Sequence, residues 1–253
     1  MDDTSLDSIL DSLSRVPRLL VISDFDGTIA ELQDDPETVP VNRDSVTALE
    51  TLGGLPDTGA VILSGRDLAT LRRLAGAGAA VDLVGSHGAE STGDTVAPTV
   101  EQRRRLDAVT ELLEPLVDGC PGAAVEVKPL HRVLHTRRVP DREAGERLLR
   151  RAVELCPEGL HVSTGKCIVE FSAVSVDKGT WISGARERGG WDAIVFLGDD
   201  VTDENGFGVL GDGDLGIKVG DGPTAAGHRV ADTDGVCAVL GRLAEARSAY
   251  LDR

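Results

Sequence analysis

Two acidic segments of the chain contain residue types that could bind a divalent cation. Residues 24–28 read DFDGT and residues 198–204 read GDDVTDE, and each segment follows an apolar run. Carboxylates held close together repel one another unless a cation binds, and hard oxygen ligands favour Mg²⁺. Most Asp pairs in an acidic chain are solvated, so either segment alone is a moderate signal. Together they predict a magnesium site.

Lys178 is a further candidate because lysine is rare in this chain. Only four lysines occur, and this one lies in VDKGT at residues 176–180. The alternative interpretation is a surface lysine at the start of a helix. We favour a lysine of the site, because the chain is expected to re-enter its main domain at this point.

The elements that must position these residues are predicted to be buried parallel strands. Apolar runs occupy residues 18–23, 59–63, 81–85, 193–200 and 215–220, and helical spacing occurs at 5–14, 43–52, 67–75 and 235–248. This alternation predicts an α/β fold with a parallel sheet. Ligands of such sheets bind at the carboxyl ends of the strands. Adjacent strands would therefore bring both acidic segments to one edge.

The pattern changes between residues 95 and 173. Helices are expected at 99–117 and 141–155, and strands at 124–128, 132–139, 160–163 and 166–172. The strands alternate polar and apolar residues, which indicates an antiparallel sheet with one exposed face. We therefore expect a discontinuous core, 1–94 with 174–253, and an inserted α+β cap domain at 95–173.

The charge balance excludes some classes of partner. The chain has 26 basic and 43 acidic residues and a net charge of −17, so nucleic acid and anionic membranes would be repelled. A source adapted to high salt and an ordinary acidic protein are both possible explanations of the charge. No apolar run would span a membrane, and the first sixteen residues lack a signal-peptide core. The four cysteines form no CxxC pair. We expect free thiols and a cytoplasmic protein.

Four ordered motifs resemble those of the haloacid dehalogenase phosphatase superfamily. They are DFDGT, SGR at 64–66, the Lys178 segment and GDDVTDE. The resemblance implies a Rossmann-like core and a Mg²⁺-dependent phosphatase that forms a phospho-aspartate intermediate. It makes Asp24 the nucleophile, and Asp26 first the general acid and then the general base. The other implied roles are phosphoryl binding by Ser64, substrate binding by Gly65 and Arg66, and charge compensation by Lys178. Asp24, the Asp26 carbonyl and Asp199, supported by Asp203, are implied to bind Mg²⁺.

Paired opposite charges on the expected cap strands could bind a polyhydroxylated ligand. Strand periodicity places Glu126 with Lys128 on one face, His135 with Arg137, and Lys166 with Glu170. The alternative interpretation is a solvated face with cross-strand ion pairs. We expect His131 at the surface.

Together with GSHGAE at 85–90, these cap motifs resemble the trehalose-6-phosphate phosphatase family, in order, from about residue 18 to 240. The resemblance implies hydrolysis of trehalose 6-phosphate, a small-molecule sugar phosphate, with Mg²⁺, as the last step of trehalose biosynthesis. We expect a monomer. Thr136 departs from the family, which more often has Tyr there. The implied sugar contacts are Glu126, Lys128, Lys166 and Glu170, with His87, Glu90, His135 and Arg137 nearby.

Two other functions are compatible with the sequence. A related phosphatase acting on sucrose phosphate, or on mannosyl- or glucosyl-phosphoglycerate, would share the core and differ only in the cap. A catalytically silent, sugar-phosphate-binding partner of a synthase would not require all four core motifs. Here no nucleophile, acid/base, lysine or metal position is lost, which favours an enzyme.

Overall fold

The computed structural model describes residues 5–33, 35, 37–92, 94–95, 98–165 and 167–252. The chain divides into two compact units. The larger unit contains Met1–Asp94 and Val176–Arg253, and the smaller unit contains Thr95–Ser175. Each unit is described by itself below. No helix among the described residues is long and apolar enough to cross a bilayer.

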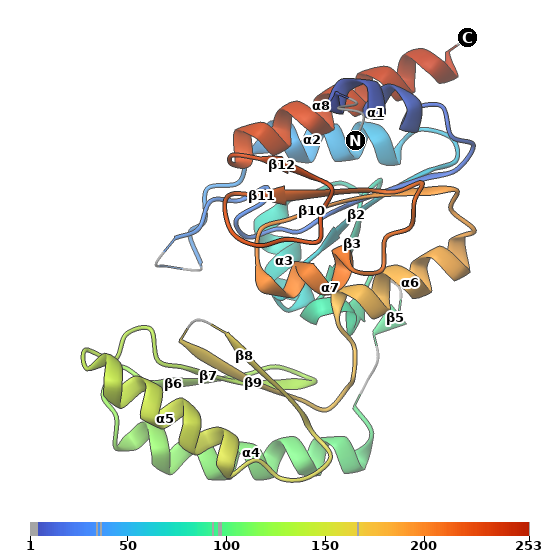
Figure 1. Ribbon diagram of the computed structural model, residues 1–253. Coiled ribbons are helices and arrows are strands. Elements are labelled where there is room, and N and C mark those ends of the chain that lie inside the picture. Colours follow the sequence, from blue (N-terminus) through green and yellow to red (C-terminus); the bar gives the residue numbers. More distant parts are fainter. Residues whose placement is uncertain are drawn as a thin grey trace. The chain divides into compact units, whose positions relative to one another are not determined.

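The larger unit is built on a mainly parallel sheet (Figure 1). In the described part of the chain its strand order is β12-β11-β10-β1-β2-β3-β4-β5. The strands from β12 to β3 pair in parallel, and β4 pairs antiparallel to β3. Their bounds are β1 Leu19–Ser23, β2 Thr58–Leu63, β3 Asp82–Gly85, β4 Glu90–Ser91, β5 Asp94–Thr95, β10 Ala193–Gly198, β11 Leu215–Val219 and β12 His228–Val230.

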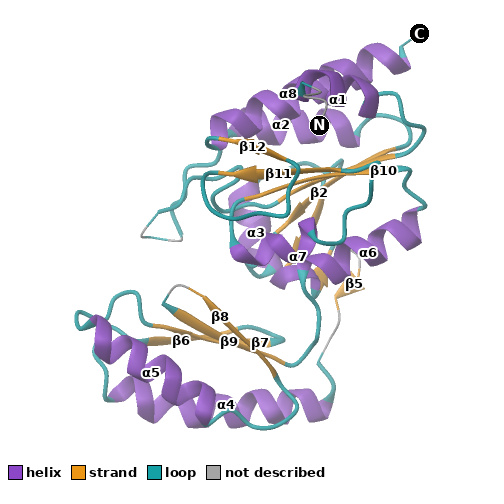
Figure 2. Ribbon diagram, viewed as in Figure 1, coloured by secondary structure: helices purple, strands orange, loops and turns teal. Residues whose placement is uncertain are grey.

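Helices cover both faces of this sheet, which is why its central strands are apolar throughout. Leu19 and Val21 of β1 pack in a core with α1, α2, α3 and α8, whereas Leu20 and Ile22 pack with α6 and α7. Figures 1 and 2 show α2 and α8 on the side of the sheet opposite α6 and α7. The bounds are α1 Leu6–Leu13, α2 Arg43–Gly53, α3 Leu68–Ala75, η1 Ser86–Gly88, α6 Lys178–Gly189, α7 Val201–Phe207 and α8 Thr233–Leu251.

The smaller unit is an antiparallel sheet of order β6-β7-β9-β8 with two helices on one face (Figure 2). Leu134, Val169 and Phe171 point to the helices and form this unit's core with residues of α4 and α5. Glu126 and Glu170 both pair in register with Val133 and lie on the opposite face. The bounds are α4 Val100–Asp118, β6 Ala124–Val127, β7 His131–His135, α5 Arg142–Glu154, β8 His161–Gly165 and β9 Ile168–Ser172.

The predicted α/β fold is confirmed, and one strand prediction is wrong. The strand expected at 132–139 ends at His135, and Arg137 is exposed in the turn that follows. The last ladder bond runs from the Thr136 N–H to the Cys167 carbonyl, 2.9 Å away. Beyond it the partner hairpin turns back, so the chain has no strand to pair with. Helices α6 and α7 and strand β12 were not among the expected elements.

Candidate active site

The two acidic segments meet at one edge of the larger sheet. Strands β1 and β10 are adjacent and parallel, and Ser23 pairs with Leu197. The Asp24 N–H continues this pairing by donating to the Leu197 carbonyl at 2.9 Å. Asp24 and Asp199 therefore follow the carboxyl ends of neighbouring strands, as the sequence predicts.

A carboxylate cluster forms at this edge around a buried lysine. Carboxylate oxygens of Asp24, Asp199 and Asp203 lie within 4.8 Å of one another. Lys178, the first residue of α6, is buried, and its Nζ lies 2.7 Å from both Asp24 Oδ1 and Asp203 Oδ1. The ammonium group of Lys178 thus bonds two carboxylates of the cluster directly, and the third, Asp199, has no bond to it.

Asp203 supports the loop that carries Asp199. Its Oδ2 accepts the backbone N–H groups of Asp199 at 3.0 Å and Asp200 at 2.9 Å, while Oδ1 pairs with Lys178. Both of its oxygens are therefore occupied by the protein. By contrast, the buried Oδ1 of Asp199 has no hydrogen-bond partner among the described residues. An orphaned buried carboxylate oxygen is costly unless a ligand satisfies it.

Two glycines make room for these carboxylates. Gly27 has a φ of +75°, and a Cβ at this position would lie 2.1 Å from Asp199 Oδ2. A Cβ at Gly198 would lie 2.3 Å from Asp203 Cγ. Any side chain at either position would displace a carboxylate of the cluster, so both glycines are required by the site.

The electrostatics of the cluster favour an additional cation. Burial, reinforced by Asp203 and Asp199, raises the pKa of Asp24 well above its ordinary value despite Lys178. Burial, Asp203 and Asp200 raise the pKa of Asp199 to about 6. Burial alone would lower the pKa of Lys178, but Asp203 and Asp24 raise it above its ordinary value. The crowded oxygens and the orphaned Asp199 Oδ1 therefore fit a hard divalent cation such as Mg²⁺.

Asp26 is held by Arg66, a residue that the family resemblance assigns to substrate binding. Nε of Arg66 donates to Asp26 Oδ2 at 2.7 Å, and Nη2 donates to Oδ1 at 2.6 Å. The guanidinium carbon also lies 5.7 Å from the Phe25 ring centroid. This planar, two-point contact fixes the plane of the carboxylate, which a lysine could not do.

Ser64 follows β2, and its loop packs against the loop of His87. Ser64 Oγ accepts the Arg66 N–H at 3.1 Å, and the Ser64 carbonyl accepts the His87 N–H at 2.9 Å. A Cβ added at Gly65 would lie 2.5 Å from His87 Cε1. Gly65 thus allows the imidazole of His87 to approach the backbone of the Ser64 loop.

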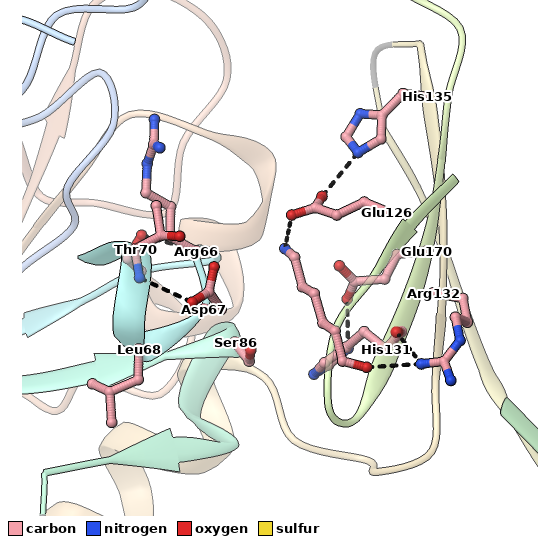
Figure 3. Close-up of polar contacts among 12 residues, drawn as sticks. Arg66, Asp67, Leu68, Thr70, Ser86, Glu126, His131, Arg132, His135 and Glu170 are labelled. Carbon is pink, nitrogen blue, oxygen red and sulfur yellow. Dashed lines mark hydrogen bonds and ion pairs between the residues drawn. The ribbon is translucent and has the colours of Figure 1, made fainter. Parts of the chain in front are cut away.

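Glu90 is buried and holds a strained turn. Its Oε1 accepts the Ser86 hydroxyl at 2.5 Å, and its Oε2 accepts the Leu68 N–H at 3.4 Å. Ser86 and His87 have φ values of 49° and 55°, a region that non-glycine residues rarely adopt. Figure 3 shows Ser86 and Leu68 beside Asp67, which caps α3 through the Thr70 N–H. The sugar contact expected of Glu90 stays a prediction.

The smaller unit brings three of the predicted sugar-binding residues together. Glu126 Oε2 lies 2.9 Å from His135 Nε2, and Glu126 Oε1 lies 3.7 Å from Lys128 Nζ (Figure 3). Glu126 therefore bridges the ammonium group of Lys128, just past the end of its own strand, and an imidazole on the neighbouring strand. The group is partly exposed on the sheet face that the unit's own helices leave open.

Glu170 has a partner that the sequence did not identify. His131 Nδ1 lies 3.1 Å from Glu170 Oε1, and His131 is buried, so its expected place at the surface is wrong. The strand register explains this burial. His131 lies on β7, which has a neighbouring strand on each side, and it pairs with Ser172 of β9. From the other face Arg132 donates to the carbonyls of Lys128 and His131 at 2.7 and 2.8 Å (Figure 3).

Two predicted sugar contacts are not part of these groups. Arg137 lies in the exposed turn after β7, and Lys166 lies outside the described residues. One residue of the larger site was missed: Lys218 of β11 is buried and donates to the Asp199 carbonyl. The available signal was a lysine within the apolar run LGIKVG.

Comparisons with known proteins agree with this geometry. A family model described as trehalose-phosphatase matches residues 22–234. The chain is 33% identical over 215 residues to a trehalose-6-phosphate phosphatase from Escherichia coli, covering 82% of this chain and 80% of that protein. It is 33% identical over 251 residues to a trehalose-phosphate phosphatase from Mycobacterium marinum, covering 90% of this chain but only 62% of the relative.

The fold also matches a solved structure. The C-terminal domain of the Candida albicans trehalose-6-phosphate phosphatase superposes with a TM-score of 0.81, covering 95% of this chain and 97% of that domain. The sequence identity is 22%. At this identity the likeness concerns the fold alone.

Proposed function

Because the chain belongs to the trehalose-phosphatase family, we propose that it hydrolyses trehalose 6-phosphate to trehalose and phosphate, the last step of trehalose biosynthesis. The observation that carries the proposal is the cluster of Asp24, Asp199, Asp203 and Lys178 at the carboxyl ends of β1 and β10. This cluster supports the proposal because phosphoryl transfer by this route needs a nucleophile, a cation and a charge-compensating lysine close together, and these residues would serve in those roles.

In the proposed first step a carboxylate oxygen of Asp24 attacks phosphorus. The bond from phosphorus to the sugar oxygen breaks, and that oxygen leaves with a proton from Asp26. In the second step Asp26 takes a proton from water, whose oxygen attacks phosphorus and releases phosphate from Asp24. Splitting one hard displacement into two lowers each barrier, and one carboxyl group serves as acid and then as base.

The residues around Asp24 and Asp26 have supporting roles in this proposal. Lys178 compensates the charge of Asp24 and of the phosphoryl group, and Ser64 donates to a phosphoryl oxygen. Arg66 orients Asp26 through its two-point contact, rather than acting only on the substrate as the sequence implies. Asp26 is partly exposed, so water can reach it for the second step.

The proposed cofactor is Mg²⁺. Asp24, Asp199 and the Asp26 carbonyl would hold it, and Asp203 would support the Asp199 loop. Bound Mg²⁺ would neutralise charge on the approaching phosphoryl group. The orphaned Oδ1 of Asp199 supports this assignment, because it is a buried ligand-type oxygen of the cluster with no hydrogen-bond partner in the described part of the chain.

The smaller unit is proposed to select the sugar. Glu126, Lys128 and Glu170 present charged groups that make strong hydrogen bonds to hydroxyls, and His135 adds a polar imidazole beside Glu126. The Glu126 bridge holds Glu126 and His135 in place before any ligand binds, which lowers the entropic cost of recognition. His87 and Glu90 of the larger unit, with Arg137 and Lys166, stay predictions as sugar contacts.

Phosphate release from a panel of sugar phosphates tests both chemistry and substrate. The panel contains trehalose 6-phosphate, sucrose phosphate, and mannosyl- and glucosyl-phosphoglycerate, each with Mg²⁺ and with EDTA. We expect a strong preference for trehalose 6-phosphate that EDTA abolishes. Metal-dependent activity on another member of the panel would contradict the proposed substrate and would still support the proposed chemistry.

The same assay on Asp24→Asn tests the nucleophile. Turnover should fall by about 10³-fold or more, because removing a catalytic nucleophile leaves only binding and electrostatic stabilisation. Asp212→Asn, the same change at an exposed position, is the control and should keep full activity. Near wild-type turnover by a folded Asp24→Asn protein would rule out the phospho-aspartate mechanism.

A further inference from the structure

Lys218 is a buried cation that the proposed mechanism does not use. It lies on β11 and pairs in register with Gly198, the last residue of β10. Its side chain is buried, and Nζ donates to the carbonyls of Asp199 and of Val219, the latter at 3.1 Å. Within the described residues Nζ forms no ion pair with a carboxylate inside 4.0 Å.

The backbone of Asp199 is therefore held at both its N–H and its carbonyl. Its N–H donates to Asp203 Oδ2 at 3.0 Å, and its carbonyl accepts from Lys218. Because Lys218 bonds the backbone, it leaves the oxygens of the Asp199 carboxylate available. Lys178 differs, since it bonds carboxylate oxygens of Asp24 and Asp203 directly.

We propose that Lys218 is a positioning residue that fixes the backbone of Asp199, so that the carboxylate of Asp199 is set in advance to bind a divalent cation. The inference rests on the magnesium site of the proposed function. Residues that orient a metal ligand without touching the metal typically change affinity by about 10–100-fold when replaced.

Two effects of Lys218 on the cation oppose each other. A nearby ammonium group repels Mg²⁺. If charge were the only effect, removing this group would tighten Mg²⁺ binding. Removing the bond to the Asp199 carbonyl would free the loop and weaken binding. We expect the second effect to dominate, because Nζ donates to two carbonyls and the part-buried carbonyl of Asp199 would otherwise lose this donor. The sign of the change therefore separates the two roles.

The experiment titrates MgCl₂ alone into the resting protein by isothermal calorimetry, so turnover does not enter the readout. Lys218→Met keeps the length and burial of the side chain and removes its donor. We expect its Mg²⁺ affinity to fall by roughly tenfold or more relative to wild type. Unchanged or tighter binding would overturn the inference. If Lys218→Met does not fold, Lys218→Gln is measured against the same criteria.

Arg247→Met is the matched control. Arg247 is also a fully buried cation that donates to backbone carbonyls, but its partners Pro17 and Thr58 lie at the amino ends of β1 and β2. That edge is opposite the carboxylate cluster. The control should lose stability and keep wild-type Mg²⁺ affinity. Wild-type protein that binds no Mg²⁺ would contradict the proposed cofactor, whereas equal binding by wild type and Lys218→Met would contradict this inference only.

Discussion

At the scale of single residues, the site is defined by which carboxylate oxygens have hydrogen-bond partners in the protein and which have none. Asp203 has both oxygens occupied by Lys178 and by backbone N–H groups. Asp199 Oδ1 is buried and unsatisfied among the described residues. The two carboxylates are four positions apart, yet one is a support and the other a candidate ligand. Residue type alone does not distinguish them.

The carboxylate of Asp199 predicts a pH dependence for the metal-free protein. Its folded pKa of about 6 exceeds the ordinary 3.8, so between these values the folded chain keeps a proton that the unfolded chain releases. The free energy of unfolding should therefore fall as the pH rises from about 4 to 6. Thermal melts in EDTA across this range would measure it.

Asp199→Asn is the control for this dependence, because it removes the titrating group and keeps the shape of the side chain. Its melting temperature should change less over the same pH range. A variant whose pH profile is as steep as that of wild type would assign the effect to other carboxylates.

Glu126 provides a residue-scale test of sugar recognition. Glu126→Gln should lower kcat/KM for trehalose 6-phosphate by roughly 10–100-fold, since a hydrogen bond to a charged group contributes about 1.5–3 kcal/mol. Hydrolysis of p-nitrophenyl phosphate, which lacks the sugar, should be unchanged. Both rates are measured beside Glu111→Gln, an exposed change on α4 of the same unit. Equal losses on both substrates would contradict a role in sugar binding.

At the scale of elements, helix starts and strand ends deliver the catalytic groups. Asp177 caps α6 through the Thr180 N–H at 2.7 Å, which fixes Lys178 as the first helical residue. Asp200 caps α7 in the same way, directly after Asp199. Each cap ties the direction of a helix to the end of a neighbouring strand. The charged groups therefore converge without belonging to one segment.

Arg247 of α8 connects elements at the opposite edge of the sheet. Its guanidinium is buried and donates to Thr58 Oγ1 at 3.0 Å and to the carbonyls of Ser14, Pro17 and Asp57 at 3.0–3.2 Å. Burial lowers its pKa, and Asp57 offsets part of that shift. This one side chain joins the segment before β1, the start of β2 and the C-terminal helix.

Arg247→Met should therefore destabilise the fold by about 3 kcal/mol, because each buried acceptor left unpaired costs roughly 1–3 kcal/mol. Urea unfolding followed by circular dichroism measures the change. Arg242→Met, on the same helix at a partly exposed ion pair with Asp11, is the comparison and should cost less than about 1 kcal/mol. Similar losses in both variants would argue against the special role of Arg247.

At the scale of the whole molecule, the net charge of −17 opposes compaction. Several exposed acidic groups have basic partners, such as Glu101 with Arg105 and Glu143 with Arg147. Such surface pairs contribute little each. With 43 acidic and 26 basic residues, pairing cannot neutralise the surface, so repulsion among carboxylates remains.

Salt should therefore stabilise this protein. Raising NaCl from about 0.1 to 1 M shortens the screening length from about 10 to 3 Å and should raise the melting temperature at pH 7.5. The same scan near the sequence pI of 4.6 should show a much smaller shift, because the net charge is then close to zero. A melting temperature that is independent of salt at pH 7.5 would contradict adaptation to high salt.

The parallel core, the two acidic segments at neighbouring strand ends and the polar face of the smaller sheet could all be predicted from the amino-acid sequence. These follow from local periodicity and from motif spacing, which a single chain displays directly. Glu126 lies on the face away from the helices because a strand has a period of two, and Lys128 contacts it from just beyond the strand end. Asp24 and Asp199 meet because two apolar strands lie side by side.

The partners of the charged groups became known only from the tertiary structure. Arg66 binds Asp26 across 40 positions, His131 contacts Glu170 from a neighbouring strand, and Lys218 holds Asp199 from β11. Arg137 leaves the sheet because the partner hairpin ends before it. Such outcomes depend on strand register and on which buried donor reaches which acceptor. Those are properties of packing between distant segments, which local sequence patterns do not encode.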